Sequence, residues 1–178
     1  TRAFTQGRVI SDNILVAFEV LHAIRGDNSA TGSMPIKLDM SKAYDRVEWA
    51  FLSRVMLKLG FRPCRVELVM KCIKSASFAF LVNGIPKGHA ISSRGLRQGD
   101  PISPSLFLFC AEGLVGLFMR AVEREVIHGY RLCPGAPVIS HLMFADDTMI
   151  FCGAAHAQAI AVKYLLADYE RASGQTVN

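Results

Sequence analysis

Hydrophobic residues recur along this chain with two different periods, and each period predicts a type of element. Spacing of three to four residues predicts helices over about 11–24, 47–59, 63–73, 104–128 and 154–171. Short apolar runs predict strands at 34–40, at 77–82 and from 85 onward, and on both sides of Asp146-Asp147. The order mixes helices with antiparallel hairpins and lacks the regular strand–helix alternation of a doubly wound sheet. An α+β fold is therefore expected.

Local signals place the ends and faces of these elements. Asn83-Gly84 is a strong hairpin-turn dipeptide, and Gly60 is well placed to end the second helix. Five apolar residues recur at helical spacing in the first helix: Ile14, Leu15, Phe18, Leu21 and Ile24. Five residues of the second helix are predicted to face inward: Trp49, Leu52, Val55, Met56 and Leu59.

Composition narrows the class of protein. The chain has 178 residues, 51% of them hydrophobic and 20% charged, which suits one folded domain and excludes disorder. The longest apolar stretch, around 106–119, is interrupted by Glu112 and is too short for a membrane span, so no membrane partner is expected. Five cysteines without CxxC spacing predict free thiols. The net charge of +5 is compatible with a polyanionic partner but is common among unrelated proteins.

Two adjacent carboxylates, Asp146 and Asp147, lie between two short apolar runs that are predicted to form the arms of a hairpin. Two like charges so close together repel, and apolar surroundings strengthen the repulsion. A bound divalent cation reverses this balance because it favours ionised oxygen ligands. The alternative is an ordinary polar hairpin tip, since Asp is common in turns.

Asp39 is the proposed partner of this pair. It ends an apolar strand, so its carboxylate can emerge at a sheet edge. If that strand lies beside the Asp146-Asp147 hairpin, three carboxylates converge and can hold two magnesium ions for nucleotidyl transfer. By spacing alone, a carboxylate that caps the following turn is the default interpretation of Asp39.

A third feature is the glycine- and arginine-rich stretch at 94–104, RGLRQGDPISP. Its two glycines permit close backbone approach to a ligand, its arginines can contact phosphates, and a helix N-terminus follows. A Gly/Pro-rich loop that merely starts a helix explains the stretch equally well. Near the start of the chain, Arg8 beside Gly7 could also bind an anion, although a surface arginine is the default there.

Together these stretches resemble a known family. In order, residues 37–45 (KLDMSKAYD), 94–101 (RGLRQGDP) and 144–147 (FADD) resemble motifs A, B and C of reverse transcriptases. The residues within these motifs are most similar to those of the non-LTR (LINE-type) retrotransposon enzymes, in particular those of plants. Residues 6–22 resemble the family's early fingers motif, 82–84 its approach to motif B, and 173–178 (SGQTVN) the opening of motif D.

The resemblance implies a right-hand polymerase palm, an antiparallel sheet packed on helices, with part of the fingers. By that analogy residues 1–33 and about 64–100 are mainly fingers, and 34–63 and 101–178 are mainly palm. The family's thumb and endonuclease regions have no counterpart in these 178 residues. The chain also lacks an initiating Met and is expected to be an excerpt, which need not be active by itself.

The resemblance also implies roles for single residues. Asp39, Asp146 and Asp147 are the implied catalytic residues and metal ligands, with the backbone carbonyl of Met40 as a further ligand. Tyr44 matches the aromatic residue beneath the incoming sugar that disfavours a ribose 2′-hydroxyl, with a core tyrosine as its structural alternative. Gln98 and Gly99 match the part of motif B that lines the nascent base pair and the nucleotide. Arg8 is a weaker match to a fingers residue near the triphosphate, and Arg97 is a weak match to a template or phosphate contact, with a surface ion pair as its alternative.

The implied function is that of an RNA-directed DNA polymerase, a nucleotidyltransferase that extends a primer 3′-hydroxyl with a dNTP. Its implied cofactor is Mg²⁺, with Mn²⁺ as a substitute, and its implied partners are an RNA template, a DNA primer and dNTP. A nuclear location follows from the family's life cycle. Two alternatives stay open: an inactive, degenerate retroelement domain that binds nucleic acid, and the palm of an RNA-directed RNA polymerase, against which Tyr44 argues.

Overall fold

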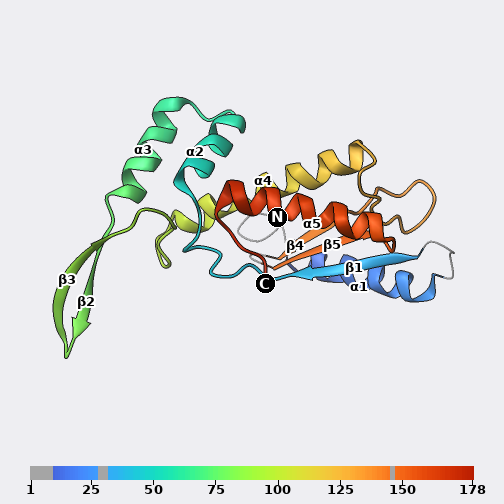
Figure 1. The fold of residues 1–178 in the computed structure, drawn as a ribbon, viewed down its shortest axis with the longest axis horizontal. Coiled ribbons are helices and arrows are strands. Elements are labelled where there is room, and N and C mark those ends of the chain that lie inside the picture. The colour runs from blue at the N-terminus through green and yellow to red at the C-terminus, as the bar shows by residue number, and fades with distance from the viewer. Residues whose placement is uncertain (1–9, 28–31, 145–146) are drawn as a thin grey trace.

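The computed structural model describes residues 10–27, 32–144 and 147–178. Five helices and five strands follow one another along this part of the chain (Figure 1). In chain order they are α1 (Ile10–Gly26), β1 (Ser33–Leu38), α2 (Trp49–Lys58), α3 (Pro63–Lys74), β2 (Ser77–Val82), β3 (Ile85–Ile91), α4 (Ser103–Glu123), β4 (His141–Phe144), β5 (Asp147–Gly153) and α5 (His156–Ser173).

A three-stranded antiparallel sheet in the order β1-β5-β4 forms the centre of the fold. Its register pairs Ser33 with Gly153 and Leu38 with Thr148, so β1 and β5 run along each other for their whole shared length. β4 and β5 form a hairpin in which Phe144 pairs with Asp147. The strand predicted to end near Asp39 and the apolar arms predicted around the acidic pair are therefore neighbours in one sheet.

Helices cover both faces of this sheet. In Figure 1, α4 and α5 run above the sheet and α1 lies below it. The main core lies on the α4 and α5 side, where Phe118, Leu114, Ile150 and Leu38 are buried together. α2 packs against α4 and α5 and extends this core to Leu52 and Met56. The α+β, palm-like architecture expected from the sequence is confirmed.

β2 and β3 form a separate two-stranded hairpin that projects from the α3 end of the molecule (Figure 1). Its turn residues Asn83 and Gly84 both have positive φ, 51° and 78°. This is the conformation that a two-residue hairpin turn requires, and the sequence predicted it. Nearly every residue of the two strands is exposed, including Phe80 and Leu81. The hairpin therefore contributes little to the core.

α1 differs from the pattern expected of an amphipathic helix. The apolar positions Ile14, Leu15 and Phe18 are exposed, and Phe18 is 66% exposed. The buried stripe of α1 consists of Asn13, Ala17 and Val20, and the Asn13 Nδ2 atom donates a hydrogen bond to the Met143 carbonyl at 2.9 Å. A narrow sheet offers contact to one stripe of a helix only, so the remaining apolar positions stay in solvent.

α4 is the longest helix in the described part of the chain and is apolar enough by length and composition to span a membrane. The sequence predicted an apolar stretch too short for a span, because Glu112 interrupts it. In the fold α4 packs against α2 and α5 and buries Phe107, Cys110 and Phe118. A core helix of a folded domain explains its hydrophobicity.

Candidate active site

The register of β1 and β5 places two of the three predicted carboxylates side by side. Leu38 pairs with Thr148 at the end of the register, and continuing that register by one residue sets Asp39 opposite Asp147. Directly opposed residues of an antiparallel pair point to the same face of the sheet. Asp39 is exposed, and the Asp147 side chain is 41% exposed. Two accessible carboxylates from distant parts of the chain thus share one end of one sheet face.

Each carboxylate already has one polar neighbour. The Asn178 Nδ2 atom donates a hydrogen bond of 2.8 Å to Asp39 Oδ2. The Lys37 ammonium lies 3.3 Å from Asp147 Oδ1. Lys37 is two residues before Asp39 on β1, so its charge lies on the same face and offsets part of the repulsion between the two carboxylates. Both contacts are exposed, and each of them involves one oxygen of its carboxylate.

Met40 continues β1 into an isolated antiparallel bridge with Val177. In this bridge the Asn178 N–H donates to the Asp39 carbonyl and the Ser41 N–H donates to the Thr176 carbonyl. Alternate residues of a strand direct their backbone groups to opposite sides, so the Met40 carbonyl points away from residues 176–178 and toward the β5 side. That direction is compatible with the metal-ligand role predicted for this carbonyl.

The third predicted carboxylate, Asp146, lies outside the described residues, as does Arg8. Within residues 10–27, 32–144 and 147–178, no group of three His, Cys, Asp or Glu side chains is arranged to hold a metal ion. Asp39 and Asp147 nevertheless provide accessible hard oxygen donors, the chemistry that Mg²⁺ prefers. The described donors fit a divalent cation, and the ligand roles of all three residues stay predictions.

Tyr44 lies in the loop that joins β1 to α2. Its ring stacks on Phe107 of α4, with ring centroids 4.8 Å apart and an interplanar angle of 12°. The residue is partly buried against the core. Stacking restricts the ring to one orientation. Tyr44 can therefore be a packed residue of the core and still make the predicted contact with a sugar. A residue that excludes a 2′-hydroxyl has to be held rigidly.

The glycine-rich loop docks against this same β1–α2 loop. The Leu96 N–H donates to the Tyr44 carbonyl and the Gly95 N–H to the Val47 carbonyl, both at 2.8 Å. The Trp49 indole N–H donates to the Gly95 carbonyl at 2.7 Å. These contacts bring the stretches that resemble motifs A and B together, although about fifty residues of sequence, including α2, α3 and the hairpin, separate them.

A cavity of about 440 Å³ opens beside this junction. Arg94, Arg97 and Gln98 are among its lining residues, as are the aromatic residues Trp49 and Phe78. Both arginines and Gln98 are exposed, as is Gly99, which has a φ of +84°. Aromatic rings beside arginines suit bases and phosphates. The lining residues come from the glycine-rich loop, the β1–α2 loop, α2, α3, β2 and the start of α4, and they do not include Asp39 or Asp147.

Arg97 also takes part in the surface ion pair that was its structural alternative. Its Nη2 atom lies 3.4 Å from Asp100 Oδ2, and the Arg97 side chain is 53% exposed. The Asp100 Oδ1 atom in turn accepts a hydrogen bond from the Ile102 N–H just before α4. An exposed ion pair of this kind contributes little to stability. Arg97 therefore remains able to exchange Asp100 for a phosphate.

Gln175 is not among the site residues expected from the sequence, although it lies in the stretch that resembles motif D. Its side chain connects the β1–α2 loop to α5. It is 2% exposed, its Nε2 atom donates to the Ala43 carbonyl at 3.0 Å, and its Oε1 atom accepts from the Tyr169 hydroxyl. Burial raises the pKa of Tyr169, which keeps this hydroxyl protonated as a donor. The available sequence signal was the resemblance of residues 173–178 to motif D, whereas the burial of the amide, which requires specific partners, is known only from the fold.

Comparison with known proteins decides the family. A family model described as reverse transcriptase (RNA-dependent DNA polymerase) matches residues 2–178.

The chain belongs to the reverse transcriptase family. It is 30% identical over 146 residues to a retrovirus-related Pol polyprotein from the type-1 retrotransposable element R2 of Popillia japonica, covering 80% of this chain and 22% of that protein. It is 54% identical over 69 residues to an uncharacterised mitochondrial protein of Arabidopsis thaliana, covering 39% of this chain and 57% of that protein. The resemblance to plant-like, non-LTR reverse transcriptases is confirmed.

Solved structures of telomerase share the fold. Apo telomerase from Candida tropicalis truncated from its C-terminal domain superposes with a TM-score of 0.62 at 16% identity, covering 98% of this chain and 34% of that one. Telomerase of the same organism in complex with a fragment of telomeric RNA gives 0.63 at 15% identity, covering 94% and 28%. The chain thus spans part of the length of each of these proteins and shares its fold with the telomerase structures.

Proposed function

We propose that this chain is the palm and part of the fingers of an RNA-directed DNA polymerase. The observation that carries the proposal is the strand register, which ends with Leu38 paired to Thr148 and so brings the accessible carboxylates of Asp39 and Asp147 to the same end of one sheet. Family membership over residues 2–178 supports the same reaction. The divisions proposed from the sequence, with 1–33 and about 64–100 as fingers, stay predictions.

In the proposed reaction the 3′-oxygen of a DNA primer attacks the α-phosphorus of a dNTP. The bond between the α-phosphorus and the bridging oxygen breaks, pyrophosphate leaves, and the hydroxyl proton passes to solvent. Asp39, Asp146, Asp147 and the Met40 carbonyl would hold Mg²⁺, or Mn²⁺ in its place. When bound, these cations neutralise charge on the attacking and leaving oxygens.

The remaining residues of the site bind and orient the substrates. Tyr44, held against Phe107, would lie beneath the sugar and exclude a 2′-hydroxyl. Gln98 and Gly99 would face the nascent base pair, and Arg97 at the cavity would meet template or nucleotide phosphate. An RNA template is supported by the telomerase relative, whose structure contains telomeric RNA. A nuclear location stays a prediction from the family's life cycle.

Primer extension tests this proposal in the longer protein that contains the chain. Asp39→Asn preserves side-chain size and removes one charged oxygen ligand. We expect it to lower the rate of dNTP addition on an RNA template by about 10²- to 10³-fold. Asp168→Asn on the exposed side of α5, where Asp168 pairs with Arg171, is the matched control and should leave the rate unchanged.

An unchanged rate in Asp39→Asn would refute the site assignment. A wild-type protein that binds Mn²⁺ through Asp39 but extends no primer on any template would instead be the degenerate domain considered from the sequence. Extension with ribonucleotides in place of deoxynucleotides would identify an RNA-directed RNA polymerase.

A further inference from the structure

The last six residues of the chain, 173–178, pair with the loop that joins β1 to α2. We refer to them as the C-terminal segment. The Glu48 N–H donates to the Ser173 carbonyl at 2.8 Å at one end of the loop. The Asn178 N–H donates to the Asp39 carbonyl at 3.0 Å at the other end. The C-terminal segment therefore contacts both ends of the loop that carries Asp39 and Tyr44.

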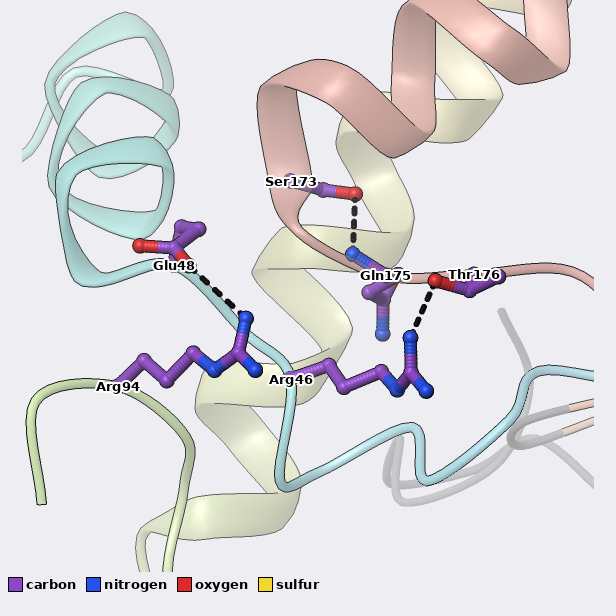
Figure 2. A network of polar contacts seen from close by, with 6 residues as sticks. All are labelled: Arg46, Glu48, Arg94, Ser173, Gln175 and Thr176. Carbon is purple, nitrogen blue, oxygen red and sulfur yellow. Dashed lines mark hydrogen bonds and ion pairs between the residues drawn. The ribbon is translucent and has the colours of Figure 1, made fainter.

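Side chains reinforce this pairing, and Figure 2 shows several of them together. The Arg46 guanidinium donates to Thr176 Oγ1 at 2.5 Å, and the Gln175 N–H donates to Ser173 Oγ at 3.2 Å. Gly174 ends α5 with a φ of +76°, and a Cβ at that position would lie 2.6 Å from the Arg46 carbonyl oxygen. The contact between the segment and the loop is so close that only glycine fits there.

Gln175 is the buried centre of the contact. Its amide bridges the Ala43 carbonyl on the loop and the Tyr169 hydroxyl on α5. Ala43 is itself a buried residue. A buried carbonyl that loses its donor costs free energy, so the loop backbone at Ala43 is held to one position by this amide. The Tyr169 hydroxyl also lies 3.2 Å from the Cys110 carbonyl, which ties the same bridge to α4.

The residue after Ala43 is Tyr44. Its ring is held by Phe107 and its carbonyl by the Leu96 N–H, so two of its contacts come from α4 and the glycine-rich loop. Gln175 adds a third restraint, because its hydrogen bond holds the Ala43 carbonyl in the peptide that precedes Tyr44. A displacement of the Ala43 peptide would carry the Tyr44 ring with it, because the two residues share a peptide plane.

We propose that Gln175 is a positioning residue for sugar selection. Through its hydrogen bond to Ala43 it sets the place of the Tyr44 ring and so the ratio of deoxyribonucleotide to ribonucleotide use. This inference rests on the proposed function, in which Tyr44 contacts the sugar of the incoming nucleotide. Gln175 itself touches neither substrate nor metal in this role.

The test measures kcat/KM for a dNTP and for the matching rNTP in the longer protein that contains this chain. Gln175→Met keeps the side-chain volume and removes both amide hydrogen bonds. We expect it to lower the dNTP/rNTP ratio by roughly 10-fold, since small misplacements of positioning groups have effects of that order or larger. Tyr169→Phe removes the hydroxyl that orients the Gln175 amide but leaves the amide itself, and should lower the ratio less.

Two further variants separate positioning from stability and from the proposed function. Val162→Ala creates a cavity under α5 in the same core without touching the loop, and should lower the melting temperature while keeping the wild-type ratio. Tyr44→Val removes the ring directly and should lower the ratio at least as much as Gln175→Met. Hydrogen exchange at residues 41–46 provides a readout independent of activity, and should rise in Gln175→Met but not in Val162→Ala.

A lower ratio and faster exchange in Gln175→Met, with neither in Val162→Ala, support the inference. A wild-type ratio in Gln175→Met and Tyr169→Phe, alongside a lower ratio in Tyr44→Val, overturns the role of Gln175 and leaves the proposed function intact. A wild-type ratio in Tyr44→Val overturns the proposed role of Tyr44 and the inference with it. If Gln175→Met does not fold, Tyr169→Phe decides between these outcomes.

Discussion

Gly95 shows how one residue without a side chain holds the two motif-bearing loops together. Its φ is +88°, and a Cβ at this position would lie 2.6 Å from the Asp45 carbonyl oxygen. Its own N–H and carbonyl bond to Val47 and Trp49. Gly99, a few residues on, has a similar φ of +84° but open space around the position of a Cβ. A side chain at Gly99 would therefore cause backbone strain alone, whereas a side chain at Gly95 would cause both strain and a clash.

This pair gives a first prediction. Gly99→Ala introduces strain at positive φ alone and should lower the free energy of unfolding by about 1 kcal/mol. Gly95→Ala adds a clash with backbone and should lower it by roughly 2–4 kcal/mol. Chemical denaturation of both variants measures the difference. Equal losses would contradict the close approach of the two loops.

His141 at the start of β4 is a second residue whose environment has a measurable consequence. Burial lowers the pKa of His141 below its ordinary value, and its Nδ1 atom lies 2.9 Å from the Ser140 hydroxyl. The folded protein therefore binds a proton at this ring less readily than the unfolded chain does. Because the unfolded state takes up more protons as pH falls below about 6.5, stability rises with pH in that range.

We accordingly expect the free energy of unfolding to fall as pH is lowered from 7 toward 5. One proton accounts for at most about 1.4 kcal/mol per pH unit of this slope. His141→Leu removes the titrating ring and should flatten the slope, whereas His22→Gln on the exposed side of α1 should not. Denaturation curves at several pH values test this, and an identical slope in His141→Leu would refute it.

At the scale of elements, α1 departs most from its sequence pattern. Spacing alone indicated Ile14, Leu15 and Phe18 as the apolar side, but the helix buries Ala17 and Val20 against the sheet. A hydrophobic period identifies a helix reliably, yet it cannot tell which stripe meets a particular sheet when apolar residues occupy more than one side. The contact geometry of α1 with β1 and β4 makes that choice.

Two substitutions in α1 test this assignment. Val20 is fully buried, so Val20→Ala should lower the free energy of unfolding by about 1.5–3 kcal/mol. Phe18→Ala removes a much larger but exposed side chain and should change it by less than about 0.5 kcal/mol. Thermal or chemical denaturation compares the two. A larger loss from Phe18→Ala would show that the sequence pattern, not the observed packing, gives the buried face.

At the scale of the whole molecule, the candidate site joins the first quarter of the chain to its last. Asp39 follows β1, Asp147 begins β5, and residues 176–178 extend the sheet on the other side of Met40. Neither carboxylate has the other as a neighbour in the unfolded chain. A cation held by both therefore binds the folded state alone, and its binding free energy adds to stability.

We expect Mg²⁺ to raise the melting temperature of the protein that contains this chain. At a hundredfold excess over the dissociation constant the gain in stability is about 2.7 kcal/mol. Asp39→Asn and Asp147→Asn should each reduce the gain, and Asp168→Asn should preserve it. Thermal unfolding with and without Mg²⁺ measures the shift. A full shift in Asp39→Asn would exclude Asp39 as a ligand.

The amino-acid sequence by itself determined the elements and some of their ends, although α4 ends at Glu123 and not near residue 128 as expected. The periods of apolar residues, the Asn83-Gly84 turn and the glycine after α2 act within a few residues, so they can be recognised without a partner. The three short motifs identified the reverse transcriptase family and named Asp39 and Asp147 as candidates. Each of these signals depends only on residues that are close together in the sequence.

Only the tertiary structure decided which distant residues meet. Strand register places Asp39 opposite Asp147, the missing side chain of Gly95 admits the second loop, and Gln175 reaches Ala43 across more than one hundred residues of sequence. Register and close packing arise from the whole core at once, since moving one strand by a single residue would turn every side chain to the other face. No local pattern contains that information.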